Sequence, residues 1–77
     1  MLLSETYGLS HIGVTLPNGD RAIYKTDHIQ AVHVYHGSLP NAHATLWLAT
    51  GGNPVITQDV VEGVDWILAR LLELHYR

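Results

Sequence analysis

The chain has 77 residues, of which 47% are hydrophobic and 14% are charged, and it contains no cysteine. Disulfide bonds, thiolate zinc sites and a cysteine nucleophile are therefore excluded. Four basic residues against seven acidic ones give a formal net charge of −3, and the basic residues are scattered, so nucleic-acid binding is not expected. Because charged residues make up about 25% of an average globular chain, this charge-poor surface is typical of a subunit that contacts another protein chain.

The length predicts one small domain that spans residues 1–77 around a single core. Residues 1–9 have no firm periodicity, and we expect them to form an arm or an extra edge strand. The sequence has no apolar run of about 18 residues and no cationic leader segment, so we expect a cytoplasmic protein without a membrane-spanning segment. Since a domain of this size without disulfides gains stability from association, a homo-oligomer, most simply a homodimer, is expected.

The first predicted element is a β-hairpin. From His11 the side chains alternate between polar and apolar, and Pro17-Asn18-Gly19-Asp20 supplies a turn with Asn-Gly at its centre. The same alternation predicts further strands, separated by a bend at Asp27 and by a loop over residues 37–42, at residues 21–26, 28–36, 44–50 and 55–56. Together they predict an antiparallel β-meander of four or five strands over about residues 11–57.

A C-terminal helix is predicted over about residues 58–76. Thr57 is a suitable N-cap, and Gln58 and Asp59 suit the first helical turn. At about 100° per residue, one broad apolar arc collects Val60, Val61, Val64, Ile67, Leu68, Leu71, Leu72 and Leu74. On the polar side Glu73 and Arg77 are spaced for an ion pair. The fold class is therefore α+β, with this helix packed on one face of the meander.

Alternation along the strands divides the side chains between two faces of the sheet. We expect the helix to cover a face that carries Ile12, Val14, Leu16, Ile23, Val32, Val34, Leu46 and Leu48. The opposite face then carries His11, Thr15, Tyr24, His33, Tyr35, Thr45 and Trp47, with His33 opposite either Thr45 or Trp47. A solvated face normally carries more charge, so these aromatic residues either brace one another or form an interface or ligand platform.

Trp66 is a second unusual residue, because the helical projection places it on the polar side of the helix. It either packs internally, along an arginine stem or on the N-terminal arm, or anchors a partner.

Six histidines raise the question of a metal site. His36 and His43 flank one loop and are weak candidates for ligands, but two imidazoles are half of a zinc site, so a second subunit or a carboxylate would have to complete it. No serine stands at an interpretable distance from a base, so catalysis is not expected, nor is a cofactor.

The leading hypothesis is a small, non-catalytic protein-interaction module, a homodimeric regulator or inhibitor of the kind that phages and mobile elements encode. It would bind either a second copy of itself or an unidentified protein target, and act by covering the bound surface. The residues that make this contact would be Tyr24, His33, Tyr35, Trp47 and Trp66. The alternative is a binding protein for a nucleotide or metabolite that uses the same face or a groove between subunits. A third hypothesis is a histidine metal site shared between subunits.

Overall fold

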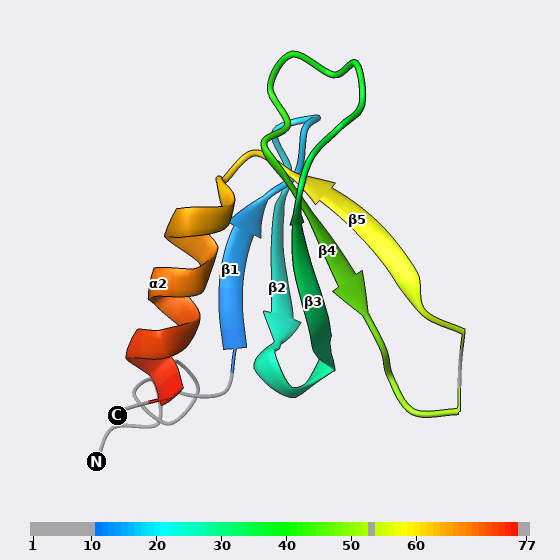
Figure 1. Ribbon diagram of the computed structural model, residues 1–77, viewed down its shortest axis with the longest axis vertical. Coiled ribbons are helices and arrows are strands. Elements are labelled where there is room, and N and C mark those ends of the chain that lie inside the picture. The colour runs from blue at the N-terminus through cyan, green and yellow to red at the C-terminus, as the bar shows by residue number, and fades with distance from the viewer. Residues whose placement is uncertain (1–10, 53, 76–77) are drawn as a thin grey trace.

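The computed structural model describes residues 11–52 and 54–75 (Figure 1). Two antiparallel sheets and a helix confirm the α+β class, and the arm expected at residues 1–9 lies outside the described residues. The elements are β1 (His11–Thr15), β2 (Arg21–Lys25), the 3-10 helix η1 (Thr26–His28), β3 (Ile29–Val34), β4 (Ala44–Leu48), β5 (Ile56–Val60) and α2 (Val64–His75).

The hairpin of β1 and β2 forms as predicted. Its turn is closed by hydrogen bonds from the Leu16 N–H to the Asp20 carbonyl (2.8 Å) and from the Gly19 N–H to the Leu16 carbonyl (2.9 Å). The Asn18 side-chain oxygen accepts the Asp20 N–H at 2.9 Å. Gly19 has a φ of 94°, a left-handed conformation that glycine adopts without steric cost. Local turn chemistry therefore determines this element.

The expected single meander is divided into two sheets. β1 and β2 form one sheet, and the second has the order β3-β4-β5. The 3-10 turn η1 separates β2 from β3, and the Ala49 N–H then donates to the His28 carbonyl at 2.8 Å, which starts the second sheet. In β3 the register shifts between Ile29 and Ala31, so Gln30 is an extra residue that interrupts the alternation.

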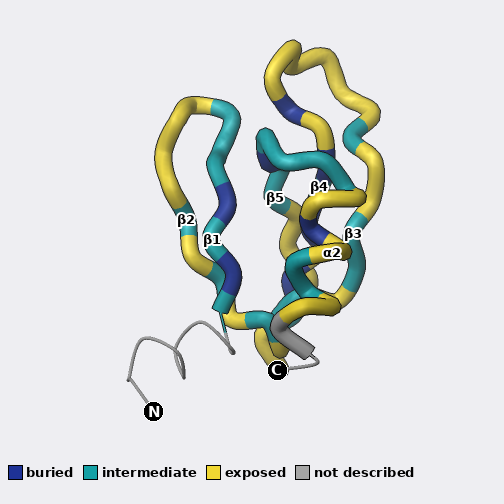
Figure 2. Tube along the Cα trace, turned by 90° about the vertical axis from the view of Figure 1, so that its left-hand side faces the viewer, coloured by how far each residue is buried: buried dark blue, intermediate teal, exposed yellow. Residues whose placement is uncertain are grey.

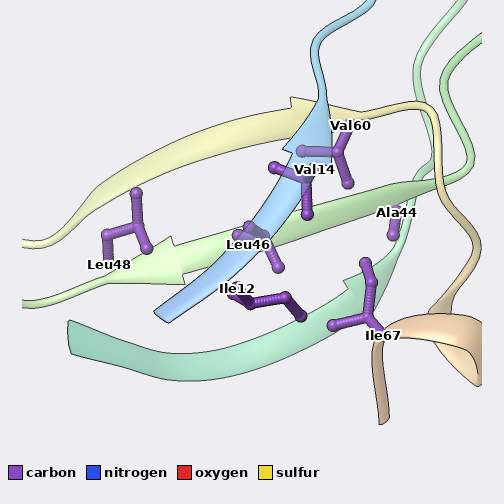
Figure 3. Close-up of a cluster of buried hydrophobic side chains, with 7 residues drawn as sticks. All are labelled: Ile12, Val14, Ala44, Leu46, Leu48, Val60 and Ile67. Atoms are coloured by element: carbon purple, nitrogen blue, oxygen red, sulfur yellow. The ribbon is translucent and has the colours of Figure 1, made fainter. Parts of the chain in front are cut away.

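The core lies between the hairpin and the inner face of the three-stranded sheet. Figure 2 shows these two sheets as separate layers, with buried residues on both β1 and β4. In Figure 3, β1 crosses the three-stranded sheet diagonally. The buried side chains of the cluster come from β1, β4, β5 and α2, and they are Ile12, Val14, Ala44, Leu46, Leu48, Val60 and Ile67. The helix α2 contributes Ile67 to this cluster, so it packs on the same side of the sheet as the hairpin.

The predicted start of the helix at residue 58 is wrong. Residues 56–60 are strand β5, paired with β4 along its whole length, and α2 begins at Val64. The Gly63 carbonyl accepts the Ile67 N–H at 3.1 Å, which makes Gly63, not Thr57, the N-cap residue. None of the helices formed by the described residues has the length and apolar character needed to cross a membrane.

Two residues expected in the core are exposed, Ile23 and Val34. The hairpin register pairs Ile12 with Tyr24 and Gly13 with Ile23, so Ile23 faces away from the core. Val34 is opposite Ala44 but stands at the end of the edge strand β3. The apolar arc of the helix is also narrower than predicted, because Val64, Ile67 and Leu71 pack on the core while Leu68 and Leu72 are exposed.

Candidate functional site

The candidate site is the face of the three-stranded sheet that points away from the hairpin. Cross-strand partners share a face, and the register opposes Ala31 to Trp47, His33 to Thr45, Thr45 to Asp59 and Trp47 to Thr57. This confirms the prediction that His33 lies opposite Thr45 or Trp47. We call this surface the outer sheet face, and its residues are Ala31, His33, Thr45, Trp47, Thr57 and Asp59.

Trp47 is the central side chain of the outer sheet face. It stands on β4, the middle strand, between Leu46 and Leu48, which are 0% and 3% exposed, yet Trp47 itself is 41% exposed. The His33 ring packs beside it, with the ring centroids 4.8 Å apart and an angle of 39° between the ring planes. The two rings therefore form one aromatic patch at the sheet's centre.

A polar pair adjoins this patch. The Thr45 hydroxyl donates to Asp59 Oδ1 at 2.9 Å across strands β4 and β5. Asp59 is the one carboxylate among the residues of the outer sheet face. The face therefore offers aromatic contact area together with one hydrogen-bonded carboxylate.

The structure does not bring Tyr24 to this face. Tyr24 lies in β2 opposite Ile12, and it packs against the buried cluster. The predicted placement of Tyr24 beside Trp47 is wrong, because the hairpin forms a separate sheet whose own register turns Tyr24 towards the core. Burial raises the pKa of its phenol above the usual value of 10.0.

The raised pKa of Tyr24 predicts a loss of stability in alkali. Above about pH 10 the unfolded chain loses the phenolic proton before the folded chain does, so the free energy of unfolding falls as the pH rises from the unfolded pKa through the folded pKa. Melting temperatures measured between pH 8 and about pH 11 should fall more steeply for the wild type than for Tyr24→Phe. Parallel curves for the two proteins would mean that Tyr24 titrates alike in both states.

Tyr35 lies one residue beyond the end of β3, and its hydroxyl accepts the Leu39 N–H at 2.9 Å. Its ring lies so close to Gly37 that a Cβ there would overlap the hydroxyl group. Asn41 in the same loop donates to the Pro17 carbonyl of the hairpin turn. Tyr35 therefore organises the loop between β3 and β4, and its hydroxyl already has an internal partner.

Trp66 is 48% exposed on α2, as the helical projection predicted. Because α2 packs on the inner side of the sheet, Trp66 and the outer sheet face belong to opposite layers. On the same helix Arg70 forms an ion pair with Glu73 at 3.1 Å. The predicted pairing of Glu73 with Arg77 reaches outside the described residues.

The two histidines considered as metal ligands are both exposed. His43 Nδ1 lies 2.7 Å from the Val61 carbonyl, so the ring donates from this nitrogen. Within residues 11–52 and 54–75, no group of three or more His, Cys, Asp or Glu side chains is arranged to hold a metal ion. A metal site that His36 and His43 share between subunits stays a prediction.

A polar link joins the hairpin to the start of the helix, and none of the sequence patterns predicts it. The two Glu62 carboxylate oxygens accept the Thr15 N–H at 2.8 Å and the Thr15 hydroxyl at 2.9 Å. Arg21 donates to the same hydroxyl at 2.9 Å, and the Val61 N–H donates to the Thr15 carbonyl at 2.9 Å. The link joins residues 47 positions apart in the chain, so no local pattern indicates it.

No protein-family model matches the chain, and neither a curated protein nor a solved structure matches it.

Proposed function

We propose that the chain is a small, non-catalytic interaction module, a regulator or inhibitor that binds a protein partner through the outer sheet face. The observation that carries this proposal is Trp47, which is 41% exposed on the central strand. Tryptophan is one of the residues enriched at interface hot spots, which cluster near the centre of an interface.

The composition of the face supports a protein partner. Interface cores are enriched in aromatic side chains and depleted of charge, and the outer sheet face has two aromatic rings and one carboxylate. A complementary partner surface is apolar opposite Trp47 and carries a basic or N–H donor group opposite Asp59.

The test compares two single substitutions of exposed tryptophans, Trp47→Ala and Trp66→Ala. Each variant and the wild type are immobilised, and proteins captured from an extract of the source cells are quantified by mass spectrometry. We expect a partner that the wild type and Trp66→Ala retain and that Trp47→Ala loses. For an interface hot spot of at least about 2 kcal/mol, the dissociation constant for the purified partner rises about thirtyfold or more.

Both tryptophans are exposed, so both variants should keep the circular dichroism spectrum and cooperative unfolding of the wild type. Loss of the partner with Trp66→Ala alone would move the binding surface to α2. Equal binding by all three proteins would rule out the outer sheet face as the site of contact.

A further inference from the structure

The two edges of the three-stranded sheet differ in how they are protected. β3 has an irregular register at Gln30 and packs against α2, and both features hinder the pairing of another strand. β5, at the other edge, keeps a regular register with β4 over residues 56–60, and no other described strand pairs with it along this length (Figure 1). The β5 edge is therefore the exposed edge of the described sheet.

Hydrogen bonds at the end of β5 reveal which of its backbone groups point outward. The His43 N–H donates to the Val60 carbonyl at 2.9 Å, so the backbone groups of Val60 point towards the β4 side. Because these directions alternate along an antiparallel strand, the N–H and C=O groups of Thr57 and Asp59 point to the open edge. The bond from the Val61 N–H to Thr15 in β1 follows the same alternation.

One of these edge groups already takes a side-chain donor. Gln58 Nε2 donates to the Asp59 carbonyl at 2.9 Å, although the two residues are neighbours in the strand. The Gln58 amide thus donates the hydrogen bond that the backbone N–H of an added strand would otherwise donate to this carbonyl. Ile56, at the start of the strand, is 59% exposed.

The sequence of β5, Ile56-Thr57-Gln58-Asp59-Val60, is complementary to itself in the antiparallel direction. When two copies pair with Gln58 opposite Gln58, Ile56 faces Val60 of the second copy and Thr57 faces Asp59 of the second copy. The Thr57–Asp59 contact repeats the chemistry of the Thr45–Asp59 bond within the chain. No two charges of β5 oppose each other in this register, and the outward backbone groups of Thr57 meet those of Asp59.

We propose that two copies of this chain associate through β5, paired antiparallel about a two-fold axis at Gln58, to form one continuous sheet. Such an axis is perpendicular to the sheet, so the outer sheet faces of both copies lie on the same side. Trp47 stays uncovered in each copy, and the dimer presents two aromatic patches to a partner. This self-association goes beyond the proposed function and does not depend on it.

The first measurement is solution mass by light scattering over a range of concentrations for the wild type, Thr57→Pro and Trp47→Ala. Proline at residue 57 removes an N–H that points to the open edge, and it leaves the pairing with β4 in place. We expect a dimer for the wild type and for Trp47→Ala, and a monomer for Thr57→Pro. A wild type that stays monomeric up to about millimolar concentration, where even weak association would be detected, would overturn the proposal.

Disulfide trapping provides a test that does not depend on how proline is tolerated. The chain has no cysteine of its own, and Gln58 meets its own copy in a pair without backbone hydrogen bonds, where side chains approach closely enough for a disulfide. Gln58→Cys should form a covalent dimer under mild oxidation, whereas the matched control Gln30→Cys on the β3 edge should not. Equal cross-linking of both variants contradicts the proposal.

The two proposals fail in different ways. If Trp47→Ala dissociates the dimer, the outer sheet face makes the self-contact and the β5 pairing is wrong. If Gln58→Cys forms the covalent dimer but Trp47→Ala captures the same proteins as the wild type, the pairing holds and the proposed function fails.

Discussion

Replacing Leu46 with alanine is expected to lower the free energy of unfolding by about 2–5 kcal/mol. Leu46 is 0% exposed on the central strand β4, where it stands between Val32 and Gln58 on the neighbouring strands. The hairpin, in the facing layer, contributes Ile12 to the same cluster. The neighbours of Leu46 belong to strands on both sides and to the opposite layer, so they cannot close in to fill the cavity, and the cost should lie towards the upper part of this range.

For a domain of this size, the expected loss on Leu46→Ala is a large share of the total free energy of unfolding. Stabilities of about 0.05–0.15 kcal/mol per residue are usual, and each kcal/mol shifts the melting temperature of a small domain by about 4–8 °C. Urea unfolding followed by circular dichroism measures the change. Leu72→Ala makes the same chemical change at a side chain that is 56% exposed and should stay within about 0.5 kcal/mol of the wild type. Equal losses for the two variants would contradict the arrangement of the core.

The hairpin was the element most readily predicted, because its determinants are local. Asn18 and Gly19 specify the turn, and the strands on either side alternate without interruption. The sequence pattern does not determine how the hairpin, which ends at Lys25, packs against the rest of the chain. Its position across the inner face depends on the contacts of Ile12 and Val14 with β4 and β5, which are distant in the chain.

The sequence at the boundary between β5 and α2 favours a helix over the strand that the structure shows. Val60 and Val61 extend the apolar arc of the helix backwards, while the three consecutive polar residues Thr57, Gln58 and Asp59 break the polar–apolar alternation that indicates a strand. The pairing of residues 56–60 with β4 decides in favour of the strand. That pairing is non-local, so it overrides the helix-start signal at Thr57.

Only part of the candidate site can be predicted from the sequence, because only some of its residues are placed by alternation within neighbouring strands. His33 and Trp47 come from strands joined by one loop, and alternation alone requires that they share a face. Tyr24 comes from the hairpin, and its side depends on a register that the length of the turn determines. The open edge at Thr57 and Asp59 cannot be predicted from a sequence pattern that places these residues in a helix.

The second large effect is expected at Glu62, whose carboxylate holds the end of the hairpin against the start of the helix. Glu62→Ala removes the acceptors of the Thr15 N–H and hydroxyl, and both donors are partly buried. Hydrogen bonds to a charged group contribute about 1.5–3 kcal/mol each, and less where water can replace the acceptor. We expect the free energy of unfolding to fall by about 1–3 kcal/mol. Chemical unfolding measures the change, with Glu73→Ala as the matched control.

Glu73 is also a carboxylate paired with an arginine, but the pair is exposed, and its removal should change the free energy of unfolding by at most about 1 kcal/mol. Thr15→Ala completes a double-mutant cycle with Glu62→Ala. Thr15→Ala keeps the backbone N–H and loses the hydroxyl that joins Glu62 to Arg21, so the two substitutions should be non-additive by about 0.5 kcal/mol or more. Strict additivity would mean that the Thr15 hydroxyl and the Glu62 carboxylate do not interact in solution. A measurable coupling would show that the hairpin is held by a specific polar contact as well as by the apolar core.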